Sequence, residues 1–354
     1  MTTVSANLQK PVLQYGSLAG WPFKLAEGLR SIGQPSVNVI PEDSDFSDLK
    51  RKLPFHEAIS SPGSSRLLKV AQRMRFLLGI PSRFSMVHYH ASHLLRGSAH
   101  HLVEGPYLHH HGIPMLVSFA GSDARNLEKA NARNPYFFRA PDPAHDAAID
   151  RYLKSLSKYV RFAATDCEMA EYIEPYFERV FTFRQLVALD EIRATEPRTD
   201  RPPVILHVPT DTEVKGTSYI FEAVERLRAS GHVFEFRTTR QLTQTELYRA
   251  IEDADIYVDE LRCGSHGVTA VEAMAAGKAT VTFIRPDLID KYPADLPIAN
   301  ANPDTIYEAL KKLISDHEFR KQKSLEGRRY VEKYHASKVV AREMLDVYRQ
   351  IGLK

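Results

Sequence analysis

The chain has 354 residues, 47 of them basic and 44 acidic, so its net charge of +3 gives no excess that would indicate a nucleic-acid partner. Two cysteines, Cys167 and Cys263, lie far apart and match no metal-ligand spacing, which argues against a disulfide framework. No apolar run approaches the roughly 20 residues that span a bilayer, and the first residues lack a signal-peptide pattern. We therefore expect a soluble cytoplasmic protein of two domains.

The first elements predict the start of a doubly wound α/β sheet. An apolar run at 11–15 reads as a buried strand, a small-residue loop follows at 16–22, and a helix at 23–31 precedes a strand at 37–40. Gly20 and its neighbours would let a ligand approach the start of that helix. The loop carries no dinucleotide fingerprint, so an ordinary strand–helix connection is the alternative interpretation.

The segment that follows is polar and basic. Residues 43–52 read as a solvated insertion, 60–65 as a flexible loop, and 66–78 as a helix with a basic face. That face, carried by the 66–75 segment, predicts either a peripheral contact with a membrane surface or a solvated exterior.

Histidines and small-residue turns follow the next strands. The strand at 84–90 ends in His88 and His90, which point to one side, where ligands of open α/β sheets gather; two histidines alone do not make a zinc site. The run 109–111 reads as the C-terminal end of a helix. A strand at 113–119 leads to a turn with Asp123 and Arg125, where a simple helix cap is the alternative.

The pattern continues with a strand at 159–165, a helix from 166 to about 175 and a strand at 180–187. It then gives way to a charged, proline-bearing stretch. We assign domains at 1–189 and 204–335, joined by a linker at 190–203, with a terminal helix in 336–354. The second domain is predicted to be a further βαβ series, with strands at 204–208, 234–237, 256–258 and 279–283 and helices at 219–228, 243–252 and 303–315. Two last helices are predicted at 318–334 and 337–351.

Residues 259–277 are the most informative stretch. A predicted strand ends at an acidic residue, Asp259, and is followed by a turn rich in glycine, serine and histidine. A helix of small residues then begins near Val268 and carries Glu272 in its second turn. Free N–H groups at such a helix start suit a phosphate, and Glu272 suits a ribose hydroxyl. Lys215 precedes another helix start and can add charge there. An Asp-Ala-Asp triplet at 253–255 is interpreted as a polar loop rather than a metal motif.

Taken together, these motifs resemble the retaining GT-B glycosyltransferases of family 4. The resemblance covers most of 11–345. It rests on His207-Val208-Pro209 with Lys215-Gly216-Thr217, on the strand at 254–259, on Gly267–Lys278, and more weakly on 16–21 and 119–125. It implies two Rossmann-like doubly wound domains that face each other across a cleft, and a terminal helix in 336–354 that crosses back to the first domain.

The resemblance also implies roles for single residues. Lys215 would hold the donor diphosphate, Glu272 the ribose, and Gly267, Val268 and Thr269 the phosphates. The implied donor-binding set is Gly20, Lys215, Gly216, Thr217, Ser265, His266, Gly267, Val268, Thr269 and Glu272, and the implied catalytic set is Lys215, Glu272, Asp123 and His90. Two departures stand out. Gly264 occupies the place of the family's first motif glutamate, for which Asp259, Glu260 or His266 are candidate substitutes, and residues 207–214 contain no arginine.

The implied reaction is transfer of a sugar from a nucleotide diphosphate to a hydroxyl of a glycan, a lipid-linked or a small-molecule acceptor, with retention. It would need no metal ion and no further cofactor. Two alternatives remain: a non-catalytic protein that binds a nucleotide sugar or a partner, and a sugar-nucleotide epimerase. The nucleotide base, the sugar and the acceptor are not predicted.

Overall fold

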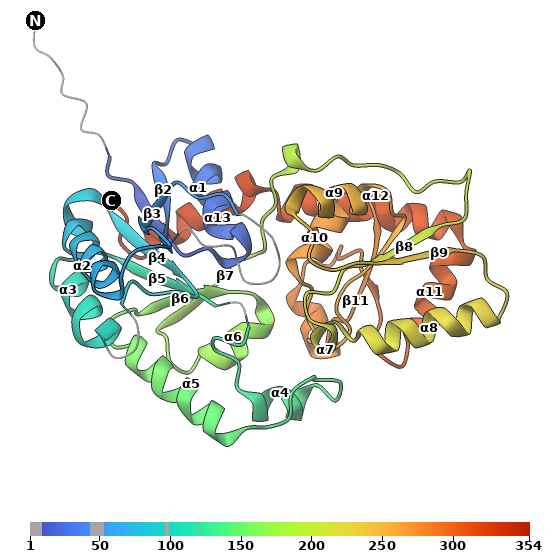
Figure 1. Ribbon diagram of the computed structural model, residues 1–354, viewed down its shortest axis with the longest axis horizontal. Helices are drawn as coiled ribbons and strands as arrows, with labels where there is room; N and C mark the ends of the chain where they lie inside the picture. The colour runs from blue at the N-terminus through green and yellow to red at the C-terminus, as the bar shows by residue number, and fades with distance from the viewer. Residues whose placement is uncertain (1–8, 43–52, 96–98, 120) are drawn as a thin grey trace, which may run out of the picture.

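A computed structural model describes residues 9–42, 53–95, 99–119 and 121–354. These residues form two all-parallel sheets, one in each half of the chain, with helices packed around both (Figure 1). The predicted α/β class with two doubly wound units is therefore confirmed. The polar insertion predicted at 43–52 lies outside the described residues.

The first sheet contains, in the described part of the chain, seven strands in the order β3-β2-β1-β4-β5-β6-β7. Buried apolar side chains fill its central strands, as expected for parallel strands covered on both faces. The strands are β1 (Val12–Tyr15), β2 (Ser36–Glu42), β3 (Glu57–Ser60), β4 (Met86–His90), β5 (Met115–Ser118), β6 (Phe162–Thr165) and β7 (Arg179–Thr182).

Helices and short turns connect these strands. The edge strand β3 and the helices α4 and α5 are absent from the sequence prediction. The elements are η1 (Leu18–Gly20), α1 (Trp21–Ser31), α2 (Arg66–Arg83), the π-helix η3 (His100–Glu104), α3 (Gly105–His110), α4 (Leu127–Arg133), α5 (Pro143–Leu156), α6 (Cys167–Ile173) and η4 (Leu189–Glu191). As far as the chain is described, no helix is both long and apolar enough to cross a membrane.

The second sheet has the order β12-β11-β10-β8-β9. Its strands are β8 (Val204–His207), β9 (Glu235–Thr238), β10 (Ile256–Val258), β11 (Ala279–Thr282) and β12 (Ala299–Asn300). Its helices and turns are α7 (Thr212–Lys215), α8 (Thr217–Ala229), α9 (Gln244–Glu252), α10 (Val268–Ala275), η5 (Pro286–Lys291), α11 (Ile306–Ser315) and α12 (His317–Tyr334).

The last helix, α13 (Ser337–Gln350), leaves the second sheet and packs beside α1 of the first half (Figure 1). Gly28 of α1 makes the approach possible, because a Cβ there would lie 2.8 Å from the Ser337 carbonyl oxygen. The Tyr348 hydroxyl lies 2.8 Å from Nδ1 of His88, whose Nε2 lies 2.7 Å from Ser118 Oγ. His88 is therefore a hydrogen-bonded core residue that ties α13 to β4.

Candidate functional site

A cavity of about 680 Å³ lies between the two halves, at the carboxyl ends of both parallel sheets. Ligands of open α/β sheets bind at this edge. Residues from both halves line it, among them Leu18, Ala19, Trp21, Gly121, Ser122, Arg125, Arg139, Asp166, Gln185, Asp211, Glu213, Glu260, Cys263, Ser265, His266, Gly267 and Val268. The turn singled out from the sequence, at 265–268, thus forms one wall of the cleft.

Two helix N-termini meet at this cavity, one from each half. α1 begins at Trp21 after Gly20, and α10 begins at Val268 after Gly267. No described side chain caps either start. The N–H groups of the first turn of α10 lack an intrahelical partner, whereas in α1 the Trp21 N–H donates to the Leu18 carbonyl and Pro22 has no N–H. Both Ala19 (φ 46°) and Gly20 (φ 77°) are left-handed, which turns the chain into α1 at the edge of the cavity. The start of α10 therefore suits an anion, and α1 adds the positive end of its dipole.

A buried charge cluster lies directly beneath the start of α10. Nζ of Lys215 donates to Oδ1 of Asp259 at 2.6 Å and to Oε2 of Glu260 at 3.1 Å. The backbone N–H of Gly267 donates to Oδ2 of Asp259 at 3.2 Å. A Cβ at Gly267 would lie 2.9 Å from that same Asp259 oxygen and 3.4 Å from Lys215 Nζ, so only glycine fits. We call Lys215, Asp259 and Glu260 the charge cluster.

The charge cluster shifts the pKa values of Lys215 and Glu260. Burial alone would lower the pKa of Lys215, but the Asp259 and Glu260 carboxylates outweigh it and raise that pKa well above its usual range. Burial raises the pKa of Glu260 to about 7; Lys215 opposes this rise and Asp259 adds to it. The ammonium group of Lys215 is thus engaged by carboxylates, and its predicted contact with a diphosphate stays a prediction.

We expect Glu260→Gln to stabilise the protein above pH 7 and to have little effect near pH 5. The folded-state pKa of Glu260 exceeds its unfolded value of 4.5, so the folded protein holds an extra proton between these values. The wild type therefore loses stability as the pH rises through this window, whereas glutamine does not titrate. Urea unfolding of both proteins at several pH values should show a gap at pH 8 on the order of 1–3 kcal/mol. If the difference in unfolding free energy between the two proteins does not change with pH, the pKa of Glu260 is not raised in the folded protein.

Glu272 is buried in α10 and is held by groups from both halves. Its Oε1 accepts from Gln244 at 3.2 Å and from the Tyr248 hydroxyl at 3.1 Å, and it lies 3.5 Å from Nζ of Lys24 on α1. All three contacts are to Oε1. No described residue donates a hydrogen bond to Oε2, so this oxygen can accept one.

The structure explains why position 264 is glycine. Gly264 has a φ of 93°, and a Cβ there would lie 2.9 Å from Cγ and 3.0 Å from Cδ of Arg285. Arg285 is buried and is held by Asp287 at 2.6 and 2.9 Å and by Glu171 of α6 at 2.6 Å. The space for a side chain at 264 is thus filled by a residue that links the two halves. Three residues are candidates to replace the glutamate expected at position 264, and two of them, Glu260 and His266, line the cavity.

The remaining predicted donor residues lie around the same turn. Gly216 is left-handed (φ 67°) and separates α7 from α8, and Thr217 Oγ1 lies 2.9 Å from Nε2 of His207. Ser265 and His266 are buried and line the cavity. Burial lowers the pKa of His266 to about 4, and neither ring nitrogen has a hydrogen-bond partner among the described residues.

Two residues of the implied catalytic set, Asp123 and His90, do not line this cavity. Oδ1 of Asp123 accepts from the Gly121 N–H at 2.8 Å, within the turn after β5. His90 is buried in β4, where Nε2 lies 2.8 Å from Gln14 Oε1 and burial lowers its pKa to about 3. Their catalytic roles stay predictions.

Two arginines that the implied donor-binding set does not contain line the cavity from the first half. Arg125 makes a bidentate pair with Glu168, at 2.7 and 3.0 Å, and is nearly buried. Arg139, between α4 and α5, is exposed, and no carboxylate of the described residues lies within ion-pair distance of it. Nothing in the local sequence distinguishes Arg139 from a surface arginine, because only the tertiary fold brings it to the cavity.

Two doubly wound parallel sheets that face a shared cleft, with a final helix that returns to the first half, define the GT-B fold. No family model matches the sequence, and no curated protein matches it. Solved structures do match over nearly the whole chain. Sucrose-phosphate synthase from Thermosynechococcus elongatus aligns with a TM-score of 0.65 at 13% identity, over 97% of this chain and 99% of that one.

Two further solved structures agree with that fold assignment. HepE from Anabaena, solved in complex with UDP-glucose, aligns with a TM-score of 0.65 at 8% identity, over 97% of this chain and 100% of that one. The trehalose 6-phosphate synthase of Burkholderia multivorans aligns with a TM-score of 0.60 at 12% identity, over 97% of this chain and 99% of that one. The chain therefore has the GT-B fold, as the sequence motifs predicted.

Proposed function

We propose that the protein is a glycosyltransferase that moves a sugar from a nucleotide diphosphate to a hydroxyl acceptor. The observation that carries the proposal is the uncapped start of α10 in the cleft, with Glu272 one turn behind it. UDP-glucose is bound in the solved HepE structure, which has the same fold. Because one fold hosts many activities, the proposed function is inferred from the residues of this site and not from the fold.

In this proposal, three features of the chain hold the donor. The N–H groups of Val268 and Thr269 bind the phosphates, Arg139 approaches them from the opposite wall, and Oε2 of Glu272 accepts from a ribose hydroxyl. Departure of the leaving group builds negative charge on the β-phosphate, and fixed N–H dipoles and a guanidinium stabilise such charge most where water is excluded. The configuration is retained, the leaving phosphate takes the acceptor proton, and neither a metal ion at the donor site nor a further cofactor is required.

Arg139→Ala is expected to weaken binding of nucleoside diphosphates about tenfold or more, because it removes the one cavity arginine that lacks a carboxylate partner among the described residues. Since the side chain is exposed, the melting temperature should stay unchanged. Calorimetric titration with UDP and GDP measures the effect. Arg133→Ala is the control, because Arg133 lies on the neighbouring α4 but pairs with Glu171. If Arg139→Ala and Arg133→Ala bind the nucleoside diphosphates with equal affinity, Arg139 does not belong to the donor site.

A screen with UDP-, GDP- and ADP-sugars tests the proposed function itself. We expect one base class to raise the melting temperature and to release nucleoside diphosphate when an acceptor is present. Binding without release, with every acceptor class tried, would indicate a non-catalytic binding protein. Conversion of the donor to an epimer without an acceptor would indicate an epimerase. No response to any nucleotide sugar would overturn the proposal.

The basic helix α2 is the proposed contact with a membrane that carries a lipid-linked acceptor. Leu67, Leu68, Val70 and Leu78 are exposed along it, beside Arg66 and Lys69. Apolar side chains flanked by basic ones suit a surface of anionic lipid. Co-sedimentation with anionic but not neutral vesicles supports the contact, and equal sedimentation of Leu67→Ser/Val70→Ser and wild type would refute it.

A further inference from the structure

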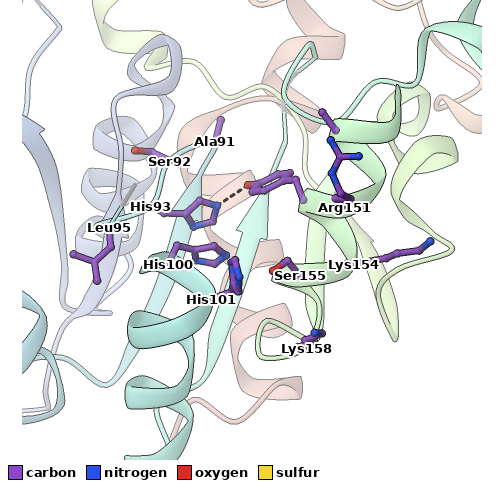
Figure 2. Close-up of a pocket in the computed structure, with 12 residues that line it drawn as sticks. Ala91, Ser92, His93, Leu95, His100, His101, Arg151, Lys154, Ser155 and Lys158 are labelled. Atoms are coloured by element: carbon purple, nitrogen blue, oxygen red, sulfur yellow. Dashed lines mark hydrogen bonds between the residues drawn. The ribbon is translucent and has the colours of Figure 1, made fainter. Parts of the chain in front are cut away.

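A second cavity lies wholly within the first half, beside the carboxyl end of β4. It has a volume of about 910 Å³ and is separate from the cleft between the sheets. Figure 2 shows His93 and His100 together on one side of it and Arg151, Lys154 and Ser155 on the other. The proposed glycosyl transfer uses none of these residues.

His93, His100 and Glu104 converge at the wall of this cavity. One potential ligand atom from each lies within 4.8 Å of the other two. The two imidazole rings stack with centroids 4.0 Å apart. His100 and Glu104 come from the π-helix η3, and His93 from the loop after β4. Single π-helical turns occur frequently at functional sites.

The hydrogen bonds of the three residues leave ligand atoms free. His100 is 4% exposed, yet neither of its ring nitrogens has a partner among the described residues, and the same holds for Nδ1 of His93. A buried polar atom without a partner is costly, so it calls for a partner that the protein chain does not supply. The carboxylate of Glu104 accepts from the N–H groups of Leu94 and Leu95 and is hydrogen-bonded to the Tyr89 side chain, which still leaves a lone pair for an ion.

The environment of His93 matches that of a metal ligand. Its Nε2 lies 2.6 Å from the Tyr152 hydroxyl, which fixes the ring and leaves Nδ1 as the free nitrogen. Ligating histidines commonly use their second nitrogen in this way. Two imidazoles with one carboxylate form a ligand set that suits Zn²⁺ with one position open.

We propose that His93, His100 and Glu104 bind one divalent transition-metal ion of the zinc type, with an open coordination position toward the cavity. Ligand atoms around tetrahedral zinc lie about 3.4 Å apart. Here they lie within 4.8 Å of one another and the two rings are stacked, so binding requires the side-chain ends to close in and one ring to turn until both lone pairs meet at the ion. Arg151 and Lys158 on the cavity wall add positive charge for an anionic molecule that reaches the ion, whereas Lys154 pairs with Asp150. This site is separate from the donor cleft, so its occupancy does not depend on the proposed function.

The test is metal binding to the full chain without an affinity tag, after treatment with a chelator. We expect about one Zn²⁺ per chain by competition with a chromophoric chelator, visible absorption bands when Co²⁺ is bound, and a rise in melting temperature with Zn²⁺ but not with Mg²⁺. His100→Gln and Glu104→Gln should each weaken Zn²⁺ binding tenfold or more.

Two control variants separate this site from other histidines. His101→Gln changes a neighbouring residue of the same cavity, and a variant with glutamine at 109–111 removes an exposed histidine run. Both should bind Zn²⁺ like wild type. The proposal is overturned if wild type shows no stoichiometric binding, or if the run at 109–111 accounts for it. If a site variant fails to fold, the melting-temperature response of wild type and of the two controls still decides the question.

Discussion

Lys215→Met is expected to destabilise the protein by about 3–5 kcal/mol, the usual result of removing one partner of a buried ion pair. Lys215 is 8% exposed, and its Nζ is the cation that faces both Asp259 and Glu260 in the charge cluster. Methionine fills similar volume but leaves two carboxylates buried together. Urea unfolding of the two proteins at pH 8, where Glu260 is ionised, measures the loss.

A surface lysine provides the matched control. Lys312 lies 2.5 Å from Asp316 in an exposed pair, so Lys312→Met should cost less than about 1 kcal/mol. Addition of Glu260→Gln to Lys215→Met should restore part of the lost stability, because one buried charge is removed. If Lys215→Met and Lys312→Met cost the same, the charge cluster does not stabilise the fold, and Lys215 is free to bind phosphate as the sequence predicted.

Gly264→Glu, which introduces the glutamate that the resemblance to family 4 implies at this position, is expected to lower stability by roughly 2–4 kcal/mol and not to raise any transfer activity. The new Cβ would meet the stem of Arg285, whose guanidinium is held by Asp287 and Glu171 and cannot move aside freely. Thermal and urea unfolding measure the loss.

A pair of alanine variants separates backbone strain from steric overlap. Gly33 has a φ of 89°, close to the 93° of Gly264, but no described atom lies within 4 Å of a Cβ built there. Gly33→Ala should therefore cost only about 1 kcal/mol, and Gly264→Ala clearly more. Equal costs would mean that Arg285 does not determine the residue at 264.

The alternation of apolar runs and amphipathic helices was sufficient to predict the central strands of both sheets, but not the edge strands β3 and β12. Parallel strands are buried on both faces and read as apolar runs, such as the one at β8. The same reasoning missed β3, whose side chains are mostly exposed at the sheet edge, and α5, which buries only Leu153 and Leu156 and so shows a weak apolar stripe.

For the candidate site, the sequence predicted local geometry but not partners between segments. The glycine turn and helix start at 267–268 lie in the cleft as expected, because that geometry is local. The contact of Lys215 with Asp259 joins residues 44 positions apart, and Arg139 reaches the cleft from the other half of the chain. Likewise His93, His100 and Glu104 match no ligand spacing, since a strand end and a π-helix bring them together.

The most direct test of the proposed donor site is the affinity for nucleoside diphosphate of Val268→Pro compared with Val268→Ala. Val268 is the first residue of α10, where proline is well tolerated, and Gly267 before it is extended (φ −85°, ψ 177°), as a residue before proline must be. Proline thus deletes one free N–H at the cavity, whereas alanine keeps it and shortens the side chain. We predict that Val268→Pro binds UDP or GDP at least tenfold more weakly than Val268→Ala at similar melting temperature. Equal affinities would contradict binding of the diphosphate at the start of α10.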